Sequence, residues 1–157
     1  MLLYLLRHAE AAPYCENDFS RALTPKGIAQ ASRIGEFLAA HEILPDLILT
    51  SPVTRARETA EIVAEKLGGD PAPTHAPWLA CGMNPDTALL ELSAYVKLDS
   101  VMIVGHEPDF SSLVASLIGL QSSSSINLSK ASLTAIELAR FAPGNGILRF
   151  FLPVKFV

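Results

Sequence analysis

Two histidines and two arginines each follow an apolar stretch of this sequence, in a pattern that suggests chemistry on an anion. Arg7 and His8 come directly after "LLYLL", Arg55 lies in "TSPVTRARETA", and His106 follows "SVMIVG". Guanidinium groups offer planar pairs of donors that suit phosphate oxygens, and a histidine ring nitrogen can attack phosphorus. These residue types predict a site for a phosphoryl group.

Their combined placement carries this hypothesis, because each residue alone has a simpler explanation. A single histidine at a strand end is more often structural, and Arg55 with Arg57 could form a solvated helix face. Together at one rim, the cationic groups would repel each other unless an anion lay between them. We therefore expect His8 to be the nucleophile, unprotonated among its cationic neighbours. His106 would donate a hydrogen bond to the phosphoryl oxygens.

A metal site is the competing use of the same residues. His8, Glu10 and His106 could supply three ligands, with His75 or Cys81 as a fourth. The adjacent fixed positive charge of the arginines opposes a divalent cation, and the sequence has no HExxH or CxxC pattern. We therefore expect neither a metal nor another cofactor.

The elements that must position these residues alternate between strand and helix. Apolar runs at 2–6, 46–50 and 100–105 are typical of strands buried on both faces. Helices are predicted at about 25–41, 52–67, 85–97 and 108–119, the first three beginning at Thr24-Pro25, Ser51-Pro52 and Asn84-Pro85. Two strand-like segments, 132–139 and 146–153, follow.

This alternation predicts an α/β fold of three layers, α/β/α, with a mostly parallel, doubly wound sheet and an antiparallel edge strand. The carboxyl ends of parallel strands share one edge of such a sheet. The segments that carry Arg7, His8, Arg55 and His106 should therefore meet there, although they are far apart in sequence.

The composition indicates the number of domains, the binding partners to be excluded and the state of the cysteines. The chain has 157 residues, half of them hydrophobic, which fits a single domain over 1–157. Its net charge of −4 and lack of a basic block argue against nucleic acid or an anionic membrane as partner. Cys15 and Cys81 lack any metal or disulfide spacing and are typical of free thiols in a cytoplasmic protein, although a bond between them remains open.

Four segments, "LLRHAEA", "LTPKGIAQA", "SPVTRARETA" and "VGHEP", resemble the histidine phosphatase superfamily, which has the phosphoglycerate mutase-like fold. The short chain and the "RHAEA" start are most similar to SixA-type phosphohistidine phosphatases. The resemblance implies that His8 accepts the phosphoryl group, while Arg7, Arg55 and His106 complete the phosphate pocket. Arg21 matches a further pocket arginine of SixA-type members, with an exposed loop arginine as the alternative.

One departure from the wider superfamily bears on the substrate. Many members carry an acidic residue before the third helix, whereas this segment reads "APWLACGMN". A phosphohistidine needs such an acid less than an ester does, because its imidazole leaves readily once protonated. Glu107 could substitute as the acid, but Pro108 beside it favours a helix cap.

The resemblance thus implies a metal-independent phosphohistidine phosphatase that acts on a protein such as a phosphotransfer domain. The short chain leaves little room for a lid over a small substrate, which also favours a protein-borne phosphohistidine. A phosphatase of small phosphate esters and a non-catalytic module that binds phosphate or a phosphoprotein remain as alternatives. The sequence leaves the oligomeric state open.

Overall fold

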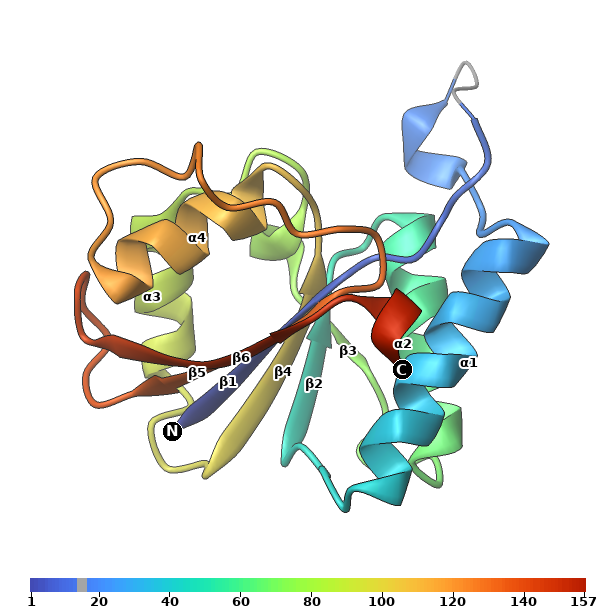
Figure 1. The fold of residues 1–157 in the computed structure, drawn as a ribbon, viewed down its shortest axis with the longest axis horizontal. Helices are drawn as coiled ribbons and strands as arrows, with labels where there is room; N and C mark the ends of the chain where they lie inside the picture. The colour runs from blue at the N-terminus through green and yellow to red at the C-terminus, as the bar shows by residue number, and fades with distance from the viewer. Residues whose placement is uncertain (14–16) are drawn as a thin grey trace.

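Across residues 1–13 and 17–157, which the structure, a computed structural model, describes, a six-stranded sheet separates two pairs of helices (Figure 1). The strands are β1 (Leu2–Arg7), β2 (Leu47–Thr50), β3 (Thr74–His75), β4 (Ser100–Gly105), β5 (Leu133–Leu138) and β6 (Gly146–Leu152). Their order in the sheet is β3-β2-β4-β1-β5-β6. The first four in this order are parallel, and β5 pairs antiparallel with both β1 and β6. The predicted mostly parallel sheet with an antiparallel edge is confirmed.

The helices lie where the sequence predicted them, with shorter ends. They are α1 (Pro25–Ala40), α2 (Thr54–Lys66), α3 (Pro85–Ser93) and α4 (Asp109–Ile118), with short 3-10 helices η1 (Asp18–Ser20), η2 (Pro77–Leu79) and η3 (Val154–Phe156). Thr24 caps α1 by accepting from the Gly27 amide, and Asn84 caps α3 by accepting from the Asp86 amide. Both predicted caps are confirmed.

The predicted start of α2 at Ser51 is wrong. The helix begins at Thr54, and Val53 precedes it without a side-chain cap. The Ser51 hydroxyl does accept a hydrogen bond from the Val53 amide at 3.2 Å, but it also lies 2.8 Å from a ring nitrogen of His106. Ser51 thus contacts His106, which follows β4, instead of capping α2.

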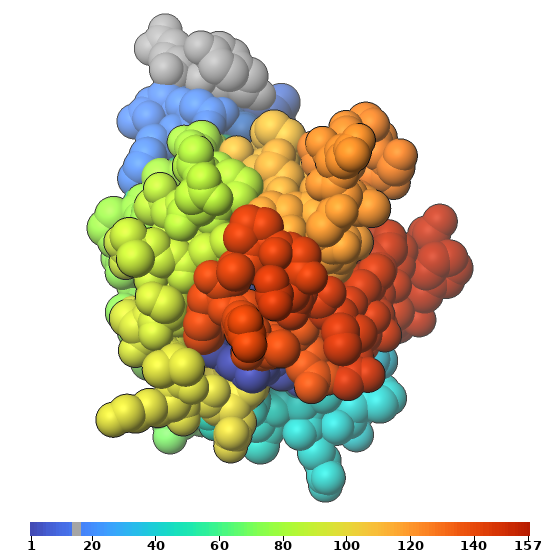
Figure 2. Space-filling model, turned by 90° about the vertical axis from the view of Figure 1, so that its left-hand side faces the viewer, coloured from blue at the N-terminus to red at the C-terminus, as the bar shows by residue number. Residues whose placement is uncertain are grey.

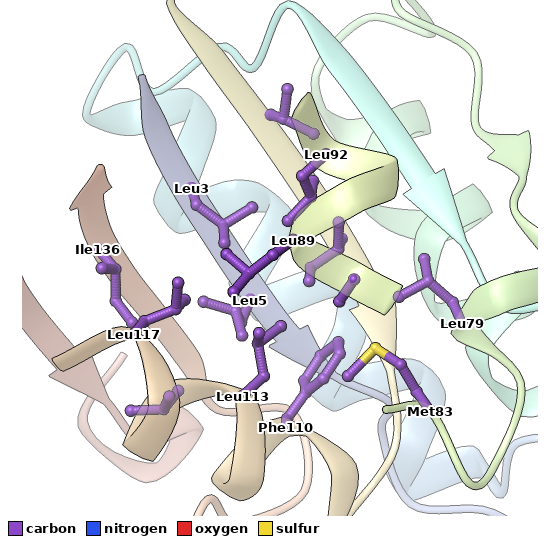
Figure 3. Close-up of a cluster of buried hydrophobic side chains, with 14 of the residues drawn as sticks. Leu3, Leu5, Leu79, Met83, Leu89, Leu92, Phe110, Leu113, Leu117 and Ile136 are labelled. Atoms are coloured by element: carbon purple, nitrogen blue, oxygen red, sulfur yellow. The ribbon is translucent and has the colours of Figure 1, made fainter. Parts of the chain in front are cut away.

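Alternate side chains of β1 fill the two cores on either side of the sheet. Leu3 and Leu5 pack with α3 and α4 (Figure 3), while Tyr4 and Leu6 pack with α1 and α2. Leu3, Leu5 and Leu6 are fully buried. This packing on both faces holds β1 in the middle of the sheet and fixes where the strand ends.

The strands β1, β2 and β4 run in the same direction and end at one edge of the sheet, at the top of Figure 1. The residues just beyond the strands stay joined, because the His8 amide donates to the Gly105 carbonyl at 3.0 Å and the Ser51 amide donates to Val104 at 2.9 Å. A Cβ on Gly105 would come within 2.8 Å of the Phe110 ring, so glycine allows α4 to pack closely here. The predicted site residues therefore start from adjoining backbone.

Candidate active site

His8 follows the last residue of β1 and is buried, with a relative exposure of 7%. Its Nδ1 lies 2.7 Å from the carbonyl oxygen of Ala9. A carbonyl only accepts, so we assign the ring proton to Nδ1. Nε2 then keeps its lone pair and accepts from Arg55 Nε at 3.3 Å.

The pKa of His8 is lowered to about 3, with burial as the largest cause. The Ala9 hydrogen bond raises this pKa, while the positive charges of His106, Arg55 and Arg7 lower it. The sequence predicts that cationic neighbours keep His8 unprotonated. In the structure the pKa of His8 is indeed lowered, but desolvation by burial is a larger cause than the neighbouring charges. At neutral pH the Nε2 lone pair is therefore available as a nucleophile.

Arg55, in the first turn of α2, is buried and connects three parts of the site. Its Nη1 donates to the Asp18 backbone carbonyl at 2.9 Å and lies 3.2 Å from the Asp18 carboxylate, while Nη2 donates to Cys81 Sγ at 3.4 Å. Its Nε is the atom that donates to His8. One guanidinium thus connects the nucleophile His8 with the half-exposed side chain of Asp18.

Arg7 ends β1 and is held by one hydrogen bond, from Nη1 to the Leu128 carbonyl at 2.6 Å. Its Nε is buried and has no acceptor among the residues that the structure describes. Burial lowers the pKa of Arg7, against a rise from the nearby negative charge of Glu107. A buried N–H without a partner is costly unless a ligand supplies the acceptor.

His106, like Arg7, has a buried nitrogen without a hydrogen-bond partner among the described residues. The residue is 2% exposed, and its ring centroid lies 5.2 Å from that of His8. Ser51 Oγ accepts from the Val53 amide, so its hydrogen is free to point at His106 Nε2. With the hydroxyl as donor, we assign the ring proton to Nδ1, which has no partner among the described residues. Burial, followed by the charge of Arg55, lowers the pKa of His106 to about 4.

The structure therefore brings together His8, Arg7, Arg55 and His106, as the sequence predicted. The nucleophilic lone pair of one histidine lies near two buried N–H donors that lack acceptors. Such donors suit the oxygens of a phosphoryl group, because an anion would satisfy them and offset the desolvated positive charge.

Arg21 reaches the site only through Asp18. Its Nε donates to Asp18 Oδ1 at 2.7 Å and its Nη1 to the Ala12 carbonyl at 2.8 Å. The predicted place of Arg21 at the edge of the pocket agrees with this geometry, whereas direct binding of phosphate by Arg21 stays a prediction. Sequence reasoning missed Asp18, although an acid three residues before a candidate site arginine is a usable signal.

Two other acidic residues near the site have structural partners. The Glu107 carboxylate accepts from the Ser111 amide at 3.1 Å and from the Ser111 hydroxyl, so it caps the first turn of α4, although Pro108 and not Glu107 holds the N-cap position. Burial raises the pKa of Glu107. Glu10 pairs with Lys26 at 2.9 Å, and this accounts for a residue that the sequence left without a role.

The competing metal hypothesis finds no support in the described part of the chain. No group of three or more histidine, cysteine or acidic side chains lies close enough to hold an ion there. His75 is an exposed residue of β3, and Cys81 is a free, exposed thiol. Cys15 lies outside the described residues. None of the described helices has the length and apolar character to cross a membrane.

Paired histidines and buried arginines lie at the carboxyl edge of a mostly parallel sheet. This combination is typical of α/β enzymes that bind phosphate. Residues 3–78 match the model of the histidine phosphatase superfamily, branch 1. The chain belongs to this superfamily, which includes phosphatases. The resemblance found in the sequence motifs is confirmed.

Individual relatives agree with this assignment. An uncharacterized protein of Picosynechococcus sp. is 32% identical over 141 residues, which cover 87% of this chain and 85% of that protein. The protein histidine phosphatase SixA in complex with tungstate has the same fold, with a TM-score of 0.89, 23% identity and 99% of each chain covered. A protein assigned as the phosphohistidine phosphatase SixA from Agrobacterium tumefaciens is 28% identical, with a TM-score of 0.82 and 97% of each chain covered.

Proposed function

We propose that this protein is a metal-independent phosphohistidine phosphatase that removes phosphate from a histidine of a partner protein such as a phosphotransfer domain. The observation that carries the proposal is the unprotonated Nε2 of His8, held 3.3 Å from Arg55 Nε beside buried donors on Arg7 and His106. This arrangement supports nucleophilic attack at phosphorus with stabilisation of the developing charge.

The first step transfers the phosphoryl group to the enzyme. The Nε2 lone pair of His8 forms a bond to phosphorus as the P–N bond of the substrate breaks and its electron pair returns to the leaving imidazole. Arg7 and Arg55 hold the phosphoryl oxygens, and the Nδ1–H of His106 donates to one of them. The Nδ1–H of His8 stays on the Ala9 carbonyl, where the bond offsets the positive charge that the ring acquires.

Water completes the cycle by attacking phospho-His8. A P–O bond forms, the P–N bond to Nε2 breaks, and the electron pair returns to Nε2 as inorganic phosphate leaves. The same donors stabilise both steps, because the phosphoryl oxygens keep their places while the groups on either side of phosphorus exchange.

The acidic side chains around the pocket favour a phosphohistidine over an ester. An alkoxide leaving group needs a proton donor, but Glu107 caps α4 and Asp18 is paired with two arginines. The hydrogen bond from Arg21 is the largest cause that lowers the pKa of Asp18, so this group is a carboxylate at neutral pH. An imidazole protonated on its far nitrogen leaves as a neutral ring and needs no further acid.

The test uses a phosphotransfer domain phosphorylated on histidine, incubated with the protein in the presence of EDTA. We expect the partner to lose its phosphate and the wild type to carry label on His8 transiently. His8→Ala abolishes the loss, whereas His41→Ala, at an exposed histidine, does not. No loss of phosphate, or loss that depends on added metal, contradicts the proposal.

Burial raises the pKa of Glu107, which favours the ester alternative because a protonated carboxyl could donate to an alcohol. In that case sugar or nucleotide phosphates are hydrolysed faster than the phosphohistidine protein, and Glu107→Gln removes the ester activity. A binding module would instead retain phosphate without releasing it. We favour phosphohistidine because both carboxylate oxygens of Glu107 already accept from Ser111.

A further inference from the structure

Asp18 places a half-exposed carboxylate next to the arginine that contacts the nucleophile. Its side chain is 49% exposed. Oδ1 lies 2.7 Å from both Nε and Nη2 of Arg21, and Oδ2 lies 3.2 Å from Nη1 of Arg55. A single guanidinium therefore separates this carboxylate from His8 Nε2.

The other carboxylates around this end of the sheet differ from Asp18 in their partners. Oxygens of Glu107, Asp109 and Glu58 accept from the backbone amides of Ser111, Gly82 and Leu23. Such bonds hold loops and helix ends in place. The side chain of Asp18 contacts two guanidinium groups and is half exposed, so it is open to a ligand that binds Arg55.

One lone pair of Asp18 remains open to a ligand. A carboxylate has about four acceptor positions, and the two contacts from Arg21 both fall on Oδ1. Among the described residues, Oδ2 contacts Arg55 alone, so it can accept an N–H from a group on the side of Arg55 away from His8.

Resting on the proposed function, we infer that Asp18 accepts a hydrogen bond from the far ring nitrogen of the substrate phosphohistidine and so selects substrates with a protonated imidazole leaving group. In-line attack by His8 puts this imidazole on the side of phosphorus opposite Nε2. Arg55 contacts His8 Nε2 through Nε and Asp18 through Nη1, so a phosphoryl group held by this guanidinium would lie between the nucleophile and the carboxylate.

The chemistry of the leaving group gives this contact its effect. When the far nitrogen carries a proton, the P–N electron pair moves into the ring and a neutral imidazole departs with that proton in place. A carboxylate facing the N–H stabilises the protonated form of the substrate. An ester has no such N–H, so this carboxylate gives its leaving group no stabilisation.

The charged and titratable groups that act on Asp18 are Arg21 and Arg55, with His106 and Cys81 close enough to interact electrostatically. The arginines keep the pKa of Asp18 below its usual value. Asp18 therefore stays ionised through the range near neutrality in which an imidazole nitrogen titrates.

The test compares wild type, Asp18→Asn and Asp18→Glu on two small substrates, phosphoimidazole and p-nitrophenyl phosphate. The first has a far ring nitrogen, and the second has a leaving group that needs neither a proton nor an N–H acceptor. Asparagine keeps an oxygen for the arginines but removes the charge. We expect kcat/KM of Asp18→Asn to fall about tenfold or more on phosphoimidazole and to stay within about threefold on p-nitrophenyl phosphate.

Two further readouts separate this role from a structural one. Asp18→Asn should lose activity on phosphoimidazole at a lower pH than wild type, because the ring proton is no longer stabilised, and Asp18→Glu should restore part of the activity. Inhibition by inorganic phosphate should change by no more than about threefold, which shows that the phosphate pocket is intact.

Equal losses on both substrates, or an unchanged rate on phosphoimidazole, overturn the inference for Asp18. A general rise in activity on both substrates also overturns it, because Asp18 would then only block Arg55. Failure of the proposed function looks different: the wild type itself would hydrolyse neither phosphoimidazole nor the phosphohistidine protein.

Discussion

Mild acidification should destabilise this protein because two histidines are buried without charge. The pKa of His8 is lowered to about 3 and that of His106 to about 4, from 6.5 in both cases. Between pH 6.5 and about 4 the unfolded chain binds protons that the folded chain does not. The free energy of unfolding therefore falls as the pH drops through this window.

The size of the effect at pH 5 depends little on the folded-state pKa values, since both imidazoles are then still neutral in the folded protein. Each histidine lowers the free energy of unfolding by about 2 kcal/mol between pH 7.5 and pH 5, and the pair by about 4 kcal/mol. The lowered pKa values of Asp18 and Glu10 place their effect below this range. The raised pKa of Glu107 acts in the opposite direction, so a comparison of variants is the sharper test.

Urea unfolding at pH 7.5 and pH 5 measures this difference for wild type, His8→Gln and His106→Gln. We expect each variant to lose about 2 kcal/mol less than wild type on acidification. If His8→Gln and wild type lose the same free energy, the buried, neutral state of His8 is refuted, and with it the argument for a free Nε2 lone pair.

Three other changes have defined outcomes. Ser51→Ala removes the hydroxyl that orients the second imidazole, so kcat for a phosphohistidine substrate should fall about tenfold to a hundredfold with KM little changed; an unchanged kcat contradicts this assignment. Arg55→Lys replaces a guanidinium that spans three partners and should lower kcat/KM at least about a hundredfold, whereas Arg57→Lys on the exposed helix face should not. Gly27→Ala puts a Cβ 1.9 Å from the Glu10 carbonyl oxygen and should lower the free energy of unfolding by about 2 kcal/mol or more; equal stability in urea would show that α1 shifts freely.

The parts of the fold that local sequence rules control could be predicted from the sequence. Thr24 and Asn84 cap helices through amides only two or three residues away, and their signals were interpreted correctly. The site residues at strand ends were also predictable, because parallel strands bring their carboxyl ends together whatever the loops contain. The two-residue strand β3 was missed because it is too short for any hydrophobic alternation.

The sequence does not show which hydrogen-bond partner a polar side chain has when two partners are possible. The Ser51 hydroxyl could cap a helix nearby or contact an imidazole 55 residues away, and only the packing of β2 against β4 favours the second. Asp18 could pair with Arg21 alone, as its spacing suggests, yet it also reaches Arg55, 37 residues further along the chain. Both contacts affect the chemistry of the candidate active site rather than the fold. With the Ser51 hydroxyl as donor, the proton of His106 lies on Nδ1, and in our proposal Asp18 decides which charge a leaving group meets. Substrate preference would then depend on contacts that residue types predict poorly and that the sheet creates by bringing distant segments to one edge.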